Sequence, residues 1–252
     1  MSGSLLPYIG IPVKWVKVFP HNSLGYEYAS GATGYWDPVL SSGTDTSYSQ
    51  MTVEFWIKVG SFPSSTAYYG IMYQGPNNAG DGLAIGANGW KVGNGTTTVA
   101  QTITPGTWYA VAITNNSGVG KLFVNGVLIS SGFTNAVSAW NIGGSSYTNY
   151  MYFGECPTGG SWIQGGASYF LCQTGLTYMA YLRISNNLRY TANYTPASTF
   201  PPFNGTDSNT IFLNYPSAGS TNSGALSDWS TYNNYGVAGS FGGLTAYSVV
   251  PF

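Results

Sequence analysis

The sequence predicts an all-β protein in which two antiparallel sheets pack as a sandwich. Short segments rich in β-branched and aromatic residues recur along the chain, and clusters of Gly, Asn and Ser separate them every eight to twelve residues or so, which is typical of sandwiches and barrels. No segment combines helical periodicity with capping residues. With 252 residues, the chain is long enough for one large β domain with its own core.

The clearest predicted strand covers residues 51–60, where apolar and polar side chains alternate with a period of two. Val53, Phe55 and Ile57 share the side expected to face the core. Further strands are predicted over residues 68–75 and 82–90, and residues 91–103 are expected to form two strands joined by a turn at "GNG".

The stretch "TWYAVAITNNSGVGKLFVNGVLIS", residues 107–130, predicts three more strands. Asn125-Gly126 favours a type I′ turn, because both central residues of that turn need a positive φ, and it joins two of these strands as a hairpin. Residues 108–114 are apolar on both faces, so we expect a central strand whose outer face is also covered.

Three motifs carry a resemblance to a known family. "TVEFWIKVGS", "GTWYAVAITNNSGVGKLFVNGVLISSG" and "YLRISNNLRYTANYTP" occur in this order, and together they resemble the laminin-G-like, concanavalin-A-like jelly-roll family. The last motif is similar to the variant found in virion proteins of tailed phages. The resemblance covers roughly residues 50–215 and implies a jelly roll of two antiparallel sheets. It divides the chain into an N-terminal arm with the first strands (1–45), the jelly roll (46–215) and a C-terminal extension packing on the domain or a neighbour (216–252).

The low charge of the chain excludes some partners. Only 6% of the residues are charged, with seven basic and eight acidic side chains, so no basic patch large enough for nucleic acid or an anionic membrane is expected. No apolar run reaches the length of a membrane span, no signal peptide is recognisable, and membrane insertion is not expected. Cys156 and Cys172 are either two reduced thiols or one disulfide, and the sequence leaves both open.

The acidic residues do not predict an enzyme. Glycoside hydrolysis normally needs two carboxyl groups facing one bond, and the glucanases that share the resembled fold carry them as Glu-x-Asp-x-x-Glu, which is absent here. No two of the eight acids lie within four positions of each other. We therefore expect no catalytic residues, although acids distant in sequence can meet in space.

A calcium ion is the one cofactor that remains a candidate. Asp45, Asp81 and Asp207 lie in oxygen-rich loops. A tight calcium site usually gathers several carboxylates, and none of these loops holds two. The favoured interpretation is that each Asp caps its own turn.

Aromatic residues are the candidate contact groups, because Tyr and Trp bury much area at low entropy cost and also suit sugar rings. The candidates for glycan or partner contact lie in predicted loops: Trp140, Tyr147, Tyr150, Tyr152, Trp162, Trp229 and Tyr232. Trp56 and Trp108 are instead expected to pack inside the sandwich. Glu54, Arg183 and Arg189 lie in or beside strands and are expected to contribute a buried or half-buried ion pair.

The N-terminal arm is a candidate docking segment. Within it, the apolar residues offered as contacts are Leu5, Leu6, Tyr8, Ile9 and Trp15. Burying one such side chain contributes roughly 1.5–3 kcal/mol, so several could hold the arm on a neighbouring subunit.

The resemblance implies a non-enzymatic structural protein of a tailed-phage virion, assembled in the bacterial cytoplasm, that serves as a capsid decoration protein or tail adhesin. Its partners would be other virion proteins, copies of itself and, for an adhesin, a host surface polysaccharide. The alternative is a carbohydrate-binding module or receptor-binding tail protein that recognises host envelope glycan. A glycoside hydrolase of the same fold is the least favoured function.

Overall fold

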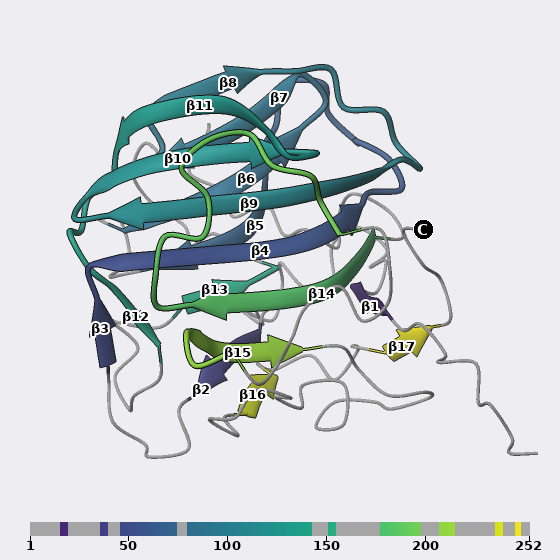
Figure 1. Cartoon of the computed structure of the whole chain (residues 1–252). Coiled ribbons are helices and arrows are strands. Elements are labelled where there is room, and N and C mark those ends of the chain that lie inside the picture. Colours follow the sequence, from purple (N-terminus) through teal and green to yellow (C-terminus); the bar gives the residue numbers. More distant parts are fainter. Residues whose placement is uncertain are drawn as a thin grey trace, which may run out of the picture.

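Two antiparallel sheets carry the fold (Figure 1). The computed structural model describes residues 16–19, 36–39, 46–74, 80–142, 151–154, 177–197, 207–214, 235–238 and 245–247. Within these ranges the regular elements are all strands, which confirms the predicted all-β class. The described part of the chain holds no helix that could cross a membrane.

The strands are β1 (Val16–Phe19), β2 (Trp36–Val39), β3 (Thr46–Tyr48), β4 (Gln50–Lys58), β5 (Tyr69–Gln74), β6 (Asp81–Gly86), β7 (Gly89–Gly93), β8 (Thr97–Ala100), β9 (Trp108–Asn116), β10 (Val119–Val124), β11 (Val127–Thr134), β12 (Trp140–Ile142), β13 (Met151–Phe153), β14 (Thr177–Ser185), β15 (Thr210–Asn214), β16 (Tyr235–Ala238) and β17 (Thr245–Tyr247). The first sheet has the order β11-β10-β9-β4-β14-β1-β17, with β15 also paired to β14, and the second has the order β16-β2-β13-β5-β6-β7-β8. A short pair, β12 with β3, forms a third sheet that is not hydrogen-bonded to either.

The core lies between the two sheets, and β4 shows how the sequence places it there. Val53, Phe55 and Ile57 are at most 1% exposed and belong to the central apolar cluster, as their alternation predicts. Val111 and Ile113 of β9 enter the same cluster from the neighbouring strand. Each such side chain contributes roughly 1.5–3 kcal/mol when fully buried.

The hairpin between β10 and β11 confirms the predicted turn. Asn125 has a φ of 51° and Gly126 a φ of 79°, the positive values that a type I′ turn needs at its central residues. The Asn125 side chain accepts a hydrogen bond from the Ala110 N–H at 2.9 Å, and the Asn125 N–H donates to the Ala110 carbonyl at 2.7 Å. The turn is therefore fixed to β9 as well as to its own strands.

Both ends of the chain contribute strands to the sandwich. β1 pairs with β14 and β17, and β2 pairs with β13 and β16. Residues 16–19 of the predicted docking arm are thus a strand of the first sheet, because their backbone groups bond to β14. The arm residues Leu5, Leu6, Tyr8, Ile9 and Trp15 lie outside the described residues, and their docking role stays a prediction.

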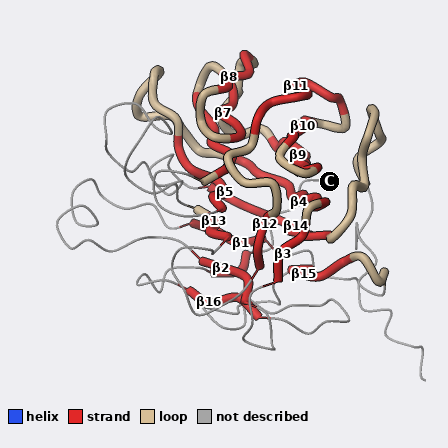
Figure 2. Tube along the Cα trace, turned by 90° about the vertical axis from the view of Figure 1, so that its left-hand side faces the viewer, coloured by secondary structure: helices blue, strands red, loops and turns tan. Residues whose placement is uncertain are grey.

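A connecting segment covers the outer face of the first sheet. Residues 186–197, here called the strap, follow β14 and cross over β4, β9 and β10, where Figure 1 shows them as a green loop in front of the sheet. In the turned view of Figure 2 the same loop lies outside the sheet, on the side away from β5 and β13. The strap is the cover that the apolar outer face of β9 predicted.

Candidate functional site

The outer face of the first sheet brings together several charged and aromatic side chains from distant strands, and a β-bulge in β14 sets their arrangement. Ala180 pairs with Trp56 and Arg183 with Glu54, so two residues of β14, Tyr181 and Leu182, stand opposite one of β4. Tyr181 has a φ of 55°, rare for a bulky residue. Because a bulge shifts the alternation by one residue, Arg183 points to the outer face instead of into the core.

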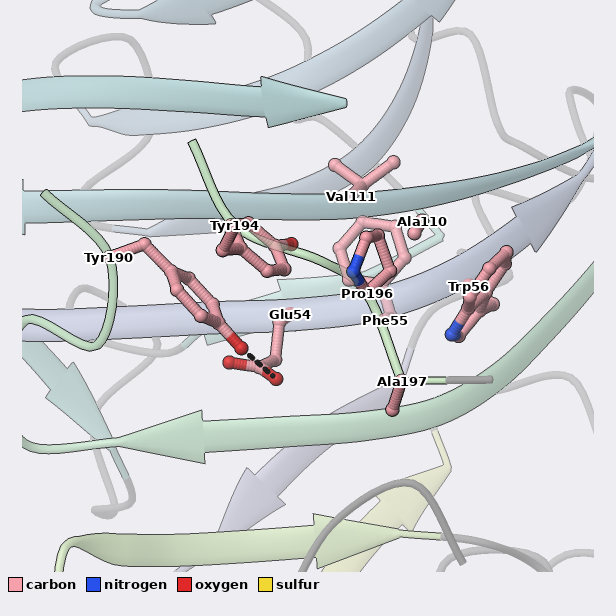
Figure 3. Close-up of a pocket in the computed structure, with 9 residues that line it drawn as sticks. All are labelled: Glu54, Phe55, Trp56, Ala110, Val111, Tyr190, Tyr194, Pro196 and Ala197. Atoms are coloured by element: carbon pink, nitrogen blue, oxygen red, sulfur yellow. Dashed lines mark hydrogen bonds between the residues drawn. The ribbon is translucent and has the colours of Figure 1, made fainter. Parts of the chain in front are cut away.

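Arg183 and Glu54 form a buried ion pair on that face. Arg183 Nη2 lies 2.6 Å from Glu54 Oε1, and the two side chains are 10% and 4% exposed. The Tyr190 hydroxyl of the strap donates to the same carboxylate oxygen at 3.1 Å (Figure 3). Of the predicted charged residues, Glu54 and Arg183 therefore pair with each other, as expected, whereas Arg189 pairs with Asp207.

Burial dominates the protonation chemistry of this cluster. It raises the pKa of the Glu54 carboxyl, and the charge and hydrogen bond of Arg183 oppose that shift. It also raises the pKa of the Tyr190 hydroxyl, and the Glu54 charge adds to this shift. The phenol therefore keeps its proton and acts as the donor to Glu54.

The strap is fixed to the sheet by hydrogen bonds at both ends. The Thr52 hydroxyl donates to the Asn187 carbonyl at 2.7 Å and accepts from the Arg189 N–H at 3.0 Å. At the other end, the Tyr194 N–H donates to the Gly126 carbonyl at 2.8 Å. Asn193 Oδ1 also accepts from a backbone N–H of β11, at 2.8 Å.

Stacked aromatic rings fill the space beneath the strap. Tyr190 and Tyr194 are parallel within 8°, with ring centroids 3.6 Å apart, and both meet the edge of Phe123 of β10. The remaining hollow, whose lining residues Figure 3 labels, has a volume of about 20 Å³. That is room for about one water molecule, so a sugar ring does not fit under the strap.

Beyond the strap, the same face carries an aromatic cluster that is partly open. Tyr178 of β14, Lys58 of β4 and Trp108 of β9 stand side by side in one row across three strands. The two rings lie 6.3 Å apart, and Lys58 Nζ lies 4.5 Å from the Tyr178 ring centre and 5.2 Å from that of Trp108. Trp56 adjoins the row on the same face of β4. All four side chains are half-buried, and we call this group the ledge.

The ledge corrects one expectation from the sequence. Trp56 and Trp108 were expected inside the sandwich, but both lie on its outer face, because they alternate with the core residues of β4 and β9. The alternation itself was the signal, since it places Trp56 and Lys58 on the side of Glu54. The sequence alone did not indicate that Trp108 pairs with Lys58, or that Lys58 pairs with Tyr178.

Trp140 corrects another expectation. It was a candidate contact residue in a loop, but it lies on β12 with 0% exposure, and its indole N–H donates to Asp81 Oδ2 at 3.3 Å. A buried indole with a buried partner packs in the core and is not available to a ligand. Tyr152 lies on β13, where only its backbone is described. Outside the described residues are Tyr147, Tyr150, Trp162, Trp229 and Tyr232.

The described calcium candidates bind groups of the protein itself. The buried Asp81 carboxylate also accepts from the N–H groups of Ala136 and Val137, and burial raises its pKa against these bonds. Asp207 pairs with Arg189 and caps its own turn through the Asn209 N–H at 2.9 Å, which holds its pKa below the usual value. No group of three His, Cys, Asp or Glu side chains forms among the described residues. Asp45 lies outside them.

Comparison with known proteins places this fold. The concanavalin A-like lectin/glucanases superfamily matches residues 31–166, more than half of the chain. The match ends before β14, so Arg183 and the strap lie beyond it. No curated protein matches the sequence.

Solved structures share the architecture at low sequence identity. A proposed carbohydrate-binding protein from Bacteroides ovatus is 18% identical with a TM-score of 0.55, over 94% of this chain and 60% of its own length. The chain therefore spans less than two thirds of that protein. A heptameric pentraxin from Limulus polyphemus is 13% identical with a TM-score of 0.45, over 71% and 79% of the two chains. A sialidase from Trypanosoma rangeli is 16% identical with a TM-score of 0.36, over 56% of this chain and 21% of its own.

Proposed function

The chain belongs to the concanavalin A-like lectin/glucanases superfamily, and from this premise we propose that it is a non-catalytic, lectin-like protein that binds a glycan at the ledge. The observation that carries the proposal is the half-open row of Tyr178, Lys58 and Trp108 on the outer face of the first sheet. The row lies outside the core and beyond the strap.

The ledge suits a sugar because it offers apolar ring surface beside polar groups. Trp and Tyr rings present flat faces to the C–H groups of a sugar, and the Tyr178 hydroxyl and the Lys58 ammonium can bond to sugar hydroxyls. The loop before β9 is exposed at Pro105, Gly106 and Thr107, and Trp108, which follows it, is half-exposed.

The described carboxylates support binding over hydrolysis. A glycosidase of the usual kind needs two carboxyl groups about 5 to 10 Å apart that both face the substrate. Glu54 is buried against Arg183, Asp81 holds two backbone amides and an indole, and Asp207 pairs with Arg189. Each of these acids has a structural partner, and none of them stands at the ledge.

Glycan binding is tested by calorimetry against a panel of oligosaccharides, with variants of the two rings. We expect Trp108→Ala and Tyr178→Ala each to weaken binding of any glycan that binds the wild-type protein at least about ten-fold. Val127→Ala is the control, because that side chain is 51% exposed on the same sheet but remote from the row. Unchanged affinity in both ring variants, or no binding to any glycan at millimolar concentration, would contradict the proposal. Release of sugar products would instead revive the hydrolase alternative.

We further propose that the protein acts on the surface of a tailed-phage virion, as a capsid decoration protein or tail adhesin. The support is the motif "RISNNLRYTANYTP", whose resemblance to phage virion proteins led to this prediction. In the structure this motif forms the end of β14 and the strap, and its residues Arg183, Arg189, Tyr190 and Tyr194 make the contacts described above. The partners would be other virion proteins or further copies of this chain.

Quantitative mass spectrometry of purified particles tests this setting. On the order of hundreds of copies per particle would indicate decoration of the head, whereas a small multiple of three or six would indicate a tail part, because such parts follow rotational symmetry. Absence of the protein from all purified particles would contradict a virion role and would leave the glycan-binding proposal standing.

A further inference from the structure

The positive charge of Lys58 at the centre of the ledge differs from the other basic groups that the structure describes. Four other basic side chains are described, and each reaches a polar group or lies buried. Arg183 and Arg189 form ion pairs, Lys121 Nζ donates to the Thr191 carbonyl at 3.0 Å, and Lys91 is only 8% exposed. Lys58 differs from them, because among the described residues its ammonium contacts the two rings and no carboxylate.

The flanking rings hold this ammonium in place without neutralising it. An ammonium within about 6 Å of a ring centre is attracted to the ring face, and Lys58 lies within that distance of two rings. The attraction restricts the long side chain, so less rotational freedom is lost when an anion binds. The nearest acid on the outer face of β4, Glu54, is occupied by Arg183.

We propose that the ledge selects acidic sugars, with Lys58 binding the anionic group while Trp108 or Tyr178 stacks on the sugar ring. This deepens the proposed function, because it rests on glycan binding at the same row and adds the class of glycan. The ligand carries a carboxylate, as in a uronic acid, or a phosphate, since a lysine ammonium pairs with either as a point charge.

The size of the preference follows from the exposure of the pair. Ion pairs at half-exposed positions contribute up to about 1 kcal/mol, because water and salt screen them. That corresponds to an affinity ratio of about five between a charged sugar and its neutral counterpart. The ratio falls as salt concentration rises, because the screening length shortens from about 10 Å at 0.1 M to about 3 Å at 1 M.

The test uses paired ligands in which one member carries the anionic group and the other has it esterified or lacks it. Calorimetry compares a galacturonate oligomer with its methyl ester, and glucose 6-phosphate with glucose, which separates carboxylate from phosphate. We expect the charged member of at least one pair to bind about five-fold tighter, and the preference to fall below two-fold in 1 M salt.

The matched variants are Lys58→Met, Lys58→Arg and Lys121→Met. Lys58→Met keeps an apolar stem and should abolish the preference, Lys58→Arg should retain it, and Lys121→Met should leave it unchanged because Lys121 lies on β10, away from the row. If Lys58→Met does not fold, the inference is still tested by the salt dependence of the wild-type preference and by whether Lys58→Arg retains that preference.

Three outcomes would overturn the inference. Equal affinity for the charged and the neutral sugar of each pair would show that the ledge does not select by charge, and it would leave the proposed glycan binding intact. A preference that survives Lys58→Met places the anion elsewhere. Binding of an acidic peptide but of no glycan would show that the ledge is a protein interface, and it would contradict the proposed function as well.

Discussion

Removing Arg183 tests the buried ion pair directly. In Arg183→Met the side chain keeps much of its apolar length, but the Glu54 carboxylate, 4% exposed, loses its counter-charge and its 2.6 Å hydrogen bond. The Tyr190 hydroxyl then remains as its donor. Breaking a buried pair in this way typically costs about 3–5 kcal/mol, because a charge is left buried without compensation.

The cost should depend on pH with a definite sign. Burial already raises the pKa of Glu54, and Arg183 opposes that shift, so removing Arg183 raises the pKa further. For an acid whose folded pKa lies above its unfolded value, the penalty is present above the folded pKa and disappears as the pH falls through it. The difference in unfolding free energy between the wild-type protein and Arg183→Met should therefore shrink between pH 8 and pH 5.

Urea titrations at the two pH values measure this difference. We expect the unfolding free energy of Arg183→Met to be lower than that of the wild-type protein by about 3 kcal/mol or more at pH 8. The double variant Glu54→Gln/Arg183→Met should regain at least about 1 kcal/mol of it and lose the pH dependence, since no buried charge remains. Lys121→Met, which removes a half-buried cation of the same sheet and its one hydrogen bond to the Thr191 carbonyl, should change the free energy by less than about 1 kcal/mol. A loss of under 1 kcal/mol in Arg183→Met, or a loss equal at both pH values, would refute the reasoning.

Three further predictions concern the turn, the acid limit and the arm. In thermal melts, Gly126→Ala should destabilise the fold by at least about 1 kcal/mol more than Gly132→Ala. Both positions have a positive φ (79° and 76°), but a Cβ at Gly126 would lie 1.9 Å from the Tyr194 carbonyl oxygen, whereas one at Gly132 would meet nothing within 4 Å. Equal losses in the two variants would count against the contact with the strap. The lowered pKa of Asp207 stabilises the fold above the unfolded-state pKa, which is near 3.9, and this stability is lost as the pH falls through the folded-state pKa. The melting temperature of Asp207→Asn should therefore fall less between pH 6 and pH 3 than that of the wild-type protein. An equal fall in the two proteins would argue against this role of Asp207. Deletion of residues 2–14 leaves β1 intact, so the melting curve should stay near normal while incorporation into particles is lost; normal incorporation would remove the docking role.

Much of the fold could be predicted because local alternation and turn chemistry act over a few residues. The strand over residues 51–60 and the turn at Asn125-Gly126 were both found in this way, and β7 and β8 flank the turn "GNG" as expected. The expected cover on the outer face of residues 108–114 is the strap.

The site was harder to predict because it depends on register between strands that are far apart in sequence. Strict alternation along β14 from the buried Met179 would point Arg183 into the core, and the bulge at Tyr181 reverses this. Trp140 became a core residue because Asp81, 59 positions earlier, offers its indole a buried acceptor. Neither the bulge nor the distant acceptor leaves a local pattern in the sequence.

The strap explains why one end of the outer face is closed and the other open. Ala110 and Ala112 of β9 are small, and both face outward, so the strap can lie close to the sheet while its Tyr190 and Tyr194 rings pack on Phe123. At the end of β9 the same face carries Trp108, which stands beyond the hollow beside Pro196 and next to Lys58. A large ring in place of either alanine would meet the strap, whereas the ring of Trp108 meets a lysine and solvent. The outer face of β9 therefore has two regions. Around Ala110 and Ala112 the face is covered by the strap, and the charges of Glu54 and Arg183 are paired and buried. Around Trp108 the face is half-exposed, and the charge of Lys58 stands between two rings. The acidic sugar of our proposal would bind in the second region without displacing the strap.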